Sequence, residues 1–220
     1  MDPVLSYAAP PIDRREIIRY MGAKELSAEL EALLDECLAE AEGRLRYSVC
    51  WQEIPVSVTG NVVKLGFAAP ESASLAARLT GCDRAVLFAA TVGLELDRLI
   101  ARYSRLQPVK GLIFQAIGAE RVEALCDAFS ADVQQWAQEQ GCCTRPRFSP
   151  GYGSVPLTLQ TDIFRVLDCS RKIGLSLNGS LLMTPTKSVT AIIGLGHGLQ
   201  QPDKEKCSAC GKGDCIFRNL

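Results

Sequence analysis

Residues 145–153 read Arg145-Pro-Arg-Phe-Ser-Pro-Gly-Tyr-Gly153 and have the composition of a ligand-binding loop. Pro150-Gly151 favours a tight turn, and the glycines at 151 and 153 allow a ligand to approach the backbone closely. Arg147 offers a planar cation that suits a carboxylate. An isolated Pro-Gly-Tyr is more often a simple surface turn, so the interpretation depends on the rest of the chain.

Regular elements are predicted on both sides of this loop. Residues 112–140 keep a helical period of apolar positions, and Gly141 closes the pattern, which predicts the longest helix. A helix is predicted again over residues 157–173. Apolar runs at 176–183 and 188–194 then flank a polar tetrapeptide and predict a hairpin.

The N-terminal half is predicted to mix helices with antiparallel strands. Apolar positions at helical spacing predict an amphipathic helix over residues 24–46. Residues 53–67 predict a hairpin, and residues 84–90 predict a buried strand that leads into a helix over 94–103. Because helices and hairpins alternate irregularly and no repeat is visible, the sequence predicts an α+β fold, a mainly antiparallel sheet with flanking helices.

Composition and charge narrow the class of protein. The chain has 220 residues, with 24 Lys and Arg against 25 Asp and Glu, a formal net charge of −1. A nearly neutral chain offers no long-range attraction to a polyanion, which disfavours nucleic acid as a partner. The sequence lacks a signal-peptide pattern and any apolar run of about 18 residues, so we expect a cytoplasmic protein that does not bind a membrane.

The loop and the second predicted hairpin together resemble one family. Arg147-Phe-Ser-Pro-Gly-Tyr-Gly153 is similar to the Arg-x-x-Pro-Gly-Tyr signature of the activation domain of cobalamin (vitamin B12)-dependent methionine synthase. About thirty residues later, Met183-Thr-Pro-Thr-Lys-Ser-Val189 is similar to the family's Met-x-Pro-x-x-Ser-Val segment. In that family the loop holds S-adenosylmethionine. The resemblance is good over residues 110–195, and the family's Tyr-Ser ligand contacts have no counterpart beyond Gly196.

The resemblance implies roles for charged residues. Arg147 would bind the carboxylate of the methionine moiety of S-adenosylmethionine, and Glu123 would neutralise its ammonium. Glu123 is predicted to share one helix face with Glu120 and Asp127, and the alternative for these acids is a solvated acidic surface. Ile12-Asp13 resembles an early Ile-Asp of the family whose aspartate contacts the ligand.

The resemblance also implies roles for the loop itself. Backbone groups at Ser149 and Gly151 would contact S-adenosylmethionine. Tyr152, the residue expected nearest to the reaction, would lie beside cobalamin when the domain is docked. The alternative is that Tyr152 caps the apolar core.

A cysteine cluster follows the region of resemblance. Its sequence is Cys207-Ser-Ala-Cys210-Gly-Lys-Gly-Asp-Cys215, in which two thiols separated by two residues and followed by glycine can bind a soft metal. A tetrahedral zinc site needs a fourth ligand, for which the candidates are His197, Cys142, Cys143 and Cys169. An iron-sulfur cluster is the second interpretation, and unliganded or redox-active thiols are the third.

The sequence therefore predicts an S-adenosylmethionine-binding reactivation protein for cobalamin-dependent methionine synthase, or for a related corrinoid methyltransferase. It would support reductive methylation of oxidised cobalamin in methionine biosynthesis, as a component of a methyltransferase system. No cobalamin-binding segment is evident, so cobalamin is expected on a partner protein, and a flavodoxin or ferredoxin would donate the electron. The alternative is a metal-binding or electron-transfer accessory protein whose working part is the cysteine cluster.

These predictions divide the chain into three parts. Residues 1–105 would form an N-terminal part of helices and a β-hairpin, and residues 106–199 the S-adenosylmethionine-binding core. Residues 200–220 would form a Cys-rich tail. We expect one compact domain followed by this tail.

Overall fold

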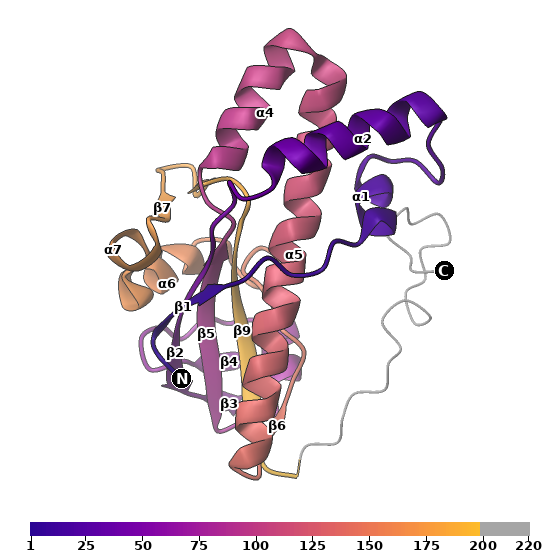
Figure 1. The fold of residues 1–220 in the computed structure, drawn as a ribbon. Coiled ribbons are helices and arrows are strands. Elements are labelled where there is room, and N and C mark those ends of the chain that lie inside the picture. Colours follow the sequence, from indigo (N-terminus) through magenta and orange to yellow (C-terminus); the bar gives the residue numbers. More distant parts are fainter. Residues whose placement is uncertain (199–220) are drawn as a thin grey trace.

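The centre of the protein is an antiparallel sheet of five strands in the order β1-β2-β5-β9-β6 (Figure 1). The computed structural model describes residues 1–198. The strands are Val4–Tyr7 (β1), Tyr47–Pro55 (β2), Arg84–Thr91 (β5), Cys143–Thr144 (β6) and Ser188–Gly196 (β9). The three long strands β2, β5 and β9 lie side by side, and the α+β fold with a mainly antiparallel sheet is confirmed.

The two faces of this sheet carry separate cores, because side chains alternate along each strand. In β5, Val86 and Phe88 belong to one core, whereas Leu87 and Ala89 belong to the other. The first core includes the helices α1 (Arg14–Tyr20), α2 (Ala28–Ala41), α4 (Glu95–Leu106) and α5 (Pro108–Glu139). The second includes α3 (Ala73–Leu79), α6 (Leu159–Leu167), α7 (Cys169–Ile173) and the hairpin of β3 (Ser57–Thr59) and β4 (Val62–Lys64).

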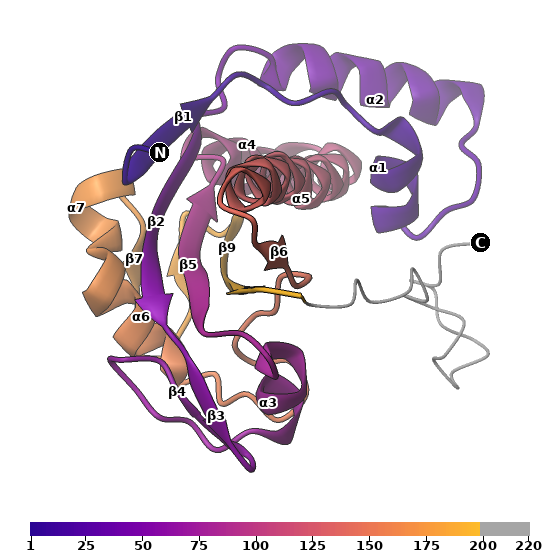
Figure 2. The ribbon, with the colours of Figure 1, turned by 90° about the horizontal axis from the view of Figure 1, so that it is seen from below.

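Helix α5 occupies the concave side of the sheet. Figure 2 shows the strands curling around this helix, which is seen there along its axis, while α6 and α7 cover the convex side. Pro108 stands at the start of the helix, where a missing N–H costs little, and Gly141 follows its end with a φ of +69°. The long helix predicted over residues 112–140 is therefore confirmed. The candidate site residues Glu123 and Asp127 lie near the middle of this helix.

Most other predicted elements are also confirmed. The predicted helix over 24–46 is α2, the predicted hairpin over 53–67 contains β3 and β4, and the strand and helix predicted from residue 84 are β5 and α4. The helix predicted over 157–173 is interrupted at Asp168, whose φ of 54° ends α6 and separates it from α7. Within residues 1–198, no helix combines the length and apolar character that a bilayer-spanning helix requires.

The second predicted hairpin is wrong. The run before the polar tetrapeptide contributes β7 (Ser176–Leu177) and β8 (Met183–Thr184), which pair with each other. The run after it becomes β9, which pairs with β5 and β6 in the main sheet. Ala191 and Ile193 of β9 lie in one core and Ile192 in the other, and a strand that is apolar on both faces belongs in the middle of a covered sheet.

Candidate functional site

The loop that follows β6 is held against the backbone of β9. The amide of Arg145 donates to the carbonyl of Gly194 at 2.8 Å. Further along, Phe148 and Ile192 exchange two backbone hydrogen bonds of 2.9 Å each. These bonds extend the sheet beyond β6 and fix the backbone on both sides of Arg147. Arg147, which is predicted to bind a carboxylate, therefore lies in a short strand-like segment beside β9.

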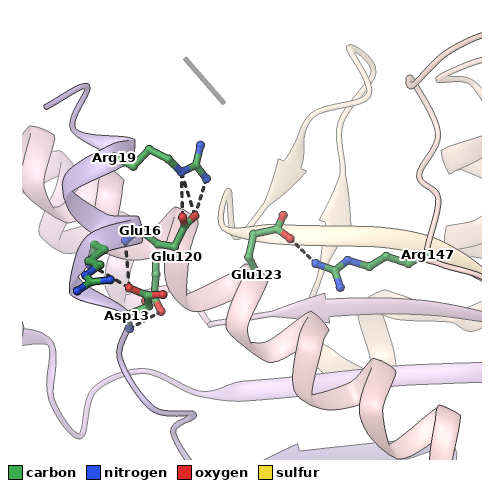
Figure 3. Close-up of polar contacts among 7 residues, drawn as sticks. Asp13, Glu16, Arg19, Glu120, Glu123 and Arg147 are labelled. Atoms are coloured by element: carbon green, nitrogen blue, oxygen red, sulfur yellow. Dashed lines mark hydrogen bonds and ion pairs between the residues drawn. The ribbon is translucent and has the colours of Figure 1, made fainter. Parts of the chain in front are cut away.

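Arg147 reaches from this loop to α5. Its Nη2 lies 2.6 Å from Oε2 of Glu123, and its Nη1 pairs with Oδ1 of Asp127 (Figure 3 draws the Glu123 contact). Burial alone would lower the pKa of Arg147, but the hydrogen bonds to the two carboxylates outweigh it and raise the pKa above its ordinary value. The structure thus brings together the two residues to which the family resemblance gives the opposite charges of one ligand.

The turn after Arg147 is stabilised by its own backbone. Gly151 has a φ of +84°, in the left-handed region that favours glycine, and its amide donates to the carbonyl of Val155 at 3.0 Å. The carbonyl of Ser149 accepts a bond of 3.4 Å from the amide of Tyr152. The side chain of Tyr152 is exposed, with 68% of its residue surface accessible. Tyr152 therefore does not cap the apolar core.

Three serines fasten this turn to the N-terminus of α3. The hydroxyl of Ser154 lies 2.9 Å from the hydroxyls of both Ser72 and Ser74, and the amide of Ser154 donates to Ser74 Oγ at 2.8 Å. Gly153 makes this approach feasible, because a Cβ there would lie 2.5 Å from Ser74 Oγ. The loop is consequently anchored on two sides, by β9 and by α3.

The acidic residues of α5 do not act as one group. Glu120 is only 4% exposed and forms a 2.5 Å ion pair with Arg121, and it accepts a 3.0 Å hydrogen bond from the amide of Asp13. Arg121 in turn donates to the carbonyl oxygens at 10–11. This buried pair fastens the N-terminal segment to α5. Of the three acids expected on one helix face, Glu120 is therefore buried, and only Glu123 and Asp127 are available to Arg147.

Helix α1 forms a second wall beside Glu123. The carboxylate of Asp13 caps α1 by accepting from two amides of its first turn, and Arg19 pairs with Glu16 at 2.5 Å (Figure 3). The pKa of Tyr20 is raised, first by burial and then by the nearby charge of Glu123. The site is therefore bordered by α1, α5 and the loop.

The second motif contacts two helices, because Thr186 binds Asp97 of α4 and Lys187 packs on α5. The amide and hydroxyl of Thr186 donate to the carboxylate of Asp97, at 2.8 Å and 2.5 Å. The neighbouring Lys187 packs on α5 at Gly118, where a Cβ would lie 2.7 Å from the lysine Cγ. Burial lowers the pKa of Lys187, and Asp97 opposes the shift. Sequence reasoning did not single out this cation, although a glycine inside a long helix often marks such a close approach.

An open depression lies elsewhere on the molecule, beside α6 and α7. It is lined by Thr161, Phe164, Arg165, Ser170, Leu177, Asn178, Gly179 and Leu181. None of these residues belongs to either motif, and α6 and α7 cover the opposite face of the sheet from α5. We therefore place the candidate site at the middle of α5.

The expected metal ligands Cys207, Cys210 and Cys215 lie outside the described residues. Within residues 1–198, no group of three or more His, Cys, Asp or Glu side chains is placed to bind a metal ion. Metal binding by Cys207, Cys210 and Cys215 therefore stays a prediction.

The candidates for an additional ligand lie in two places. Cys169 lies beside Cys50 in the second core, with a distance of 4.0 Å between their sulfurs. Cys142 lies in the first core, and its sulfur is near the imidazole of His197. Cys143 is partly exposed in β6.

Comparison with known proteins decides the family. The model of the family described as vitamin B12 dependent methionine synthase, activation domain, matches residues 73–198, which is more than half of the chain. The chain belongs to this family. The matched region runs from α3 to β9 and includes both motifs. The elements β1 and α1 of this chain precede the matched region.

A solved structure shows the same fold. The protein is similar to a crystal structure of the MetH reactivation domain bound to AdoHcy, with a TM-score of 0.60 and 16% sequence identity. The similarity covers 84% of this chain and 70% of the other. The methionine synthase activation domain fold is therefore confirmed beyond the region matched by the family model. No curated protein matches the sequence.

Proposed function

We propose that this activation domain binds S-adenosylmethionine at the Arg147–Glu123 pair and presents its methyl group to cobalamin on a partner protein. The family membership supports the cobalamin-dependent system, and the similar MetH domain was crystallised with AdoHcy, the demethylated form of S-adenosylmethionine. The observation that carries the proposal is the contact between Arg147 and Glu123, beside the turn at Gly151.

The charges of this pair are complementary to an amino acid. The methionine end of S-adenosylmethionine carries a carboxylate and an ammonium on the same carbon. A planar guanidinium can bind the carboxylate through two hydrogen bonds, and the carboxylate of Glu123 can accept from the ammonium. A zwitterion that enters between Arg147 and Glu123 replaces one ion pair by two and leaves the site's charge balanced.

The loop would supply the face toward cobalamin. The turn at Ser149 and Gly151 is fixed by backbone bonds and by the serines of α3, so its backbone can position the ligand with little loss of freedom. Tyr152 projects from this turn and is exposed. Exposed aromatic residues on fixed loops are common at protein interfaces. We assign Tyr152 to the surface that meets the partner's corrin.

This proposal makes the chain a component of a methyltransferase system in methionine biosynthesis. The partner would be a cobalamin-dependent methionine synthase, or another corrinoid protein, without an activation domain of its own. Cobalamin on that partner would supply the reduced cobalt that accepts the methyl group, and a flavodoxin or ferredoxin would be the electron donor. This chain contributes binding and orientation of the methyl donor.

Calorimetry with S-adenosylmethionine tests the proposal. The wild-type protein should bind the ligand, and Arg147→Ala should weaken binding at least about a hundredfold, because a desolvated charge-assisted contact is lost. Arg147→Lys should recover only part of the affinity, since lysine cannot bind a carboxylate through a planar fork. Arg165→Ala is the matched control, because Arg165 forms an exposed ion pair with Asp162 far from the site.

Two outcomes contradict the proposal. One is an absence of binding by the wild-type protein at millimolar S-adenosylmethionine, and the other is unchanged affinity in Arg147→Ala. Tyr152→Ala gives a separate test of docking: it should bind S-adenosylmethionine normally and slow methylation of cobalamin on the partner. Wild-type methylation by Tyr152→Ala would remove this tyrosine from the docking surface.

A further inference from the structure

Two buried thiols meet in the second core, on the convex side of the sheet. Cys50 lies in β2, where its neighbours Val49 and Trp51 point into the first core instead. Cys169 is the first residue of α7, which packs against β2. The two sulfurs are 4.0 Å apart, and both residues are 0% exposed. The fold therefore brings together two cysteines that are 119 residues apart in the sequence.

The surroundings make these two thiols unequal. A hydrogen bond from the thiol of Cys169 stabilises a thiolate at Cys50 and lowers the pKa of Cys50, although burial opposes this shift. The same contact, together with burial, raises the pKa of Cys169. The ammonium of Lys172, on α7, adds a positive charge that favours the thiolate form of both. Cys50 is therefore the thiol suited to act as a nucleophile, and Cys169 is the thiol that keeps its proton.

The thiol of Cys126 shows the contrast. Cys126 lies in the first core, and burial is the main cause that raises its pKa. A thiol whose environment is dominated by burial is inert, because the thiolate is the reactive form. At Cys50, the contact with a second sulfur outweighs burial. The pair of Cys50 and Cys169 thus differs chemically from a cysteine that only fills space in a core.

Helix α7 can close the remaining gap between the two sulfurs. A disulfide bond is about 2.0 Å long, so the sulfurs must approach each other by about 2 Å. The helix has five residues and lies between Asp168 and Gly174, whose φ values of 54° and 66° turn the chain at both ends. A change of side-chain rotamer, or a small shift of this short helix, can therefore bring the sulfurs into bonding distance.

Small oxidants can approach α7 from the surface. Ser170 and Arg171 are exposed, and Ser170 also lines the open depression beside α6 and α7. Short surface elements open locally at a lower free-energy cost than the central strands of a sheet. A local opening of α7 would expose Cys169, and with it the sulfur of Cys50, while the sheet stays folded.

We propose that Cys50 and Cys169 are a redox-active pair, which a hydroperoxide converts into a disulfide that fastens α7 to β2. The Cys50 thiolate attacks the peroxide: a sulfur–oxygen bond forms, the oxygen–oxygen bond breaks, and Cys50 becomes a sulfenic acid. The hydroxide that leaves takes up the proton that Cys50 had lost.

The second step forms the sulfur–sulfur bond. The sulfur of Cys169 attacks the sulfur of Cys50, the sulfur–oxygen bond breaks, and the thiol proton of Cys169 leaves with the hydroxyl as water. In sum, two thiols and one hydrogen peroxide give one disulfide and two waters. A small dithiol reverses the modification by thiol–disulfide exchange.

The disulfide would stabilise the protein. It joins residues that are 119 positions apart, so it restricts the unfolded chain strongly. The pair and α7 lie on the opposite side of the sheet from α5 (Figure 2). Its chemistry therefore does not depend on what binds at Arg147.

Disulfide mapping of the full chain tests this inference. Protein reduced with dithiothreitol is treated with a small excess of hydrogen peroxide, its remaining thiols are alkylated, and its peptides are analysed by mass spectrometry without reduction. A peptide pair joined through Cys50 and Cys169 is expected, and dithiothreitol should release it. The oxidised protein should unfold at a higher temperature than the reduced protein. Mapping uses the wild-type chain, so it does not depend on the folding of any variant.

Three variants separate the roles of the two thiols. Cys169→Ala should accumulate added oxygen at Cys50, because no second thiol resolves the sulfenic acid. In Cys50→Ala, Cys169 should be oxidised no faster than Cys126, and the increase in unfolding temperature should be lost. Cys37→Ala is the matched control, because Cys37 is a buried thiol of the first core. It should form the disulfide and gain stability on oxidation as the wild-type protein does.

Three outcomes would overturn the inference. The first is the absence of the peptide pair joined through Cys50 and Cys169 after most thiols have reacted. The second is oxidation of Cys169 in Cys50→Ala as fast as that of Cys50 in Cys169→Ala, which contradicts the assigned order of attack. The third is an equal change of unfolding temperature on oxidation in wild type and Cys50→Ala, which removes the stabilising role of the bond.

Discussion

Glu123 and Arg147 are 24 residues apart in the sequence, yet Oε2 of the glutamate lies 2.6 Å from Nη2 of the arginine. The long helix supplies one partner and the strand-like loop the other, so their contact depends on the packing of α5 against the edge of the sheet. Asp127 binds the second terminal nitrogen of the same guanidinium. A ligand that binds Arg147 must therefore compete with two carboxylates.

The two carboxylates should respond differently to neutralisation. Glu123→Gln should lower the affinity for S-adenosylmethionine about tenfold or more, because an amide is a weaker acceptor for the ligand's ammonium. Asp127→Asn should leave the affinity unchanged or raise it, since it removes a competitor for Arg147. Calorimetry on both variants measures the difference, and equal losses would count against the assignment of the ammonium to Glu123.

The buried pair of Glu120 and Arg121 should be important for stability rather than for binding. Glu120→Gln would leave the Arg121 guanidinium buried without its counter-charge, and we expect a loss of about 3–5 kcal/mol in the free energy of unfolding. Urea denaturation measures this loss. Glu95→Gln, which breaks an exposed ion pair with Arg98, is the control and should change stability by less than about 1 kcal/mol. Similar values for the two variants would contradict the prediction.

Gly153 should not accept a side chain. Gly153→Ala forces a left-handed φ on alanine and places its Cβ against Ser74 Oγ, so we expect a loss of about 1–3 kcal/mol and weaker S-adenosylmethionine binding. Gly60→Ala is the matched control, since Gly60 has a φ of +59° and a Cβ there meets nothing within 4 Å. Adding Ser74→Gly should restore part of the stability by relieving the overlap. Equal thermal stability in both single variants would show that the serine contact is unimportant.

Alkaline pH should destabilise the fold through buried thiols. Burial raises the pKa of Cys37 from 9.0 to about 11, so the folded protein keeps this proton after the unfolded chain has lost it. The contribution of this proton to the free energy of unfolding is fully present below about pH 9 and is lost as the pH rises toward about 11. Urea denaturation across this range should show a smaller decline in Cys37→Ala than in wild type. Cys143→Ala, which removes a partly exposed thiol, should follow the wild-type curve.

The sequence predicted the elements better than their pairing. Helical periodicity located α5, and the turn signal at residue 60 located the hairpin of β3 and β4, because both signals depend on neighbours in the chain. The partner of residues 188–196 depends instead on β5, nearly a hundred residues earlier. Local turn propensity therefore predicted a hairpin. In the structure, Ile192 and Ile193 are buried on opposite faces of the main sheet, which explains why residues 188–196 form one of its strands.

The site was predictable to a similar degree. The loop signature indicated Arg147, and helical spacing placed Glu120 on one face with Glu123 and Asp127. Spacing alone does not show which part of a helix face another segment covers. The residues at 10–13 cover Glu120 and leave the other two acids for Arg147. The contact of Lys187 with α5 was likewise invisible without the packing at Gly118.

The position of β9 in the sheet has a consequence for synthesis on the ribosome. Thr91 of β5 pairs with Ser188 of β9, 97 residues later, so a nascent chain exposes an edge of β5 until most of the protein has been translated. Nearly every residue of β5 is buried in the finished fold. An unpaired apolar edge of this kind is prone to aggregate. Expression of the protein in cells should therefore depend on chaperones that bind emerging chains, and C-terminal truncation before Ser188 should yield insoluble protein.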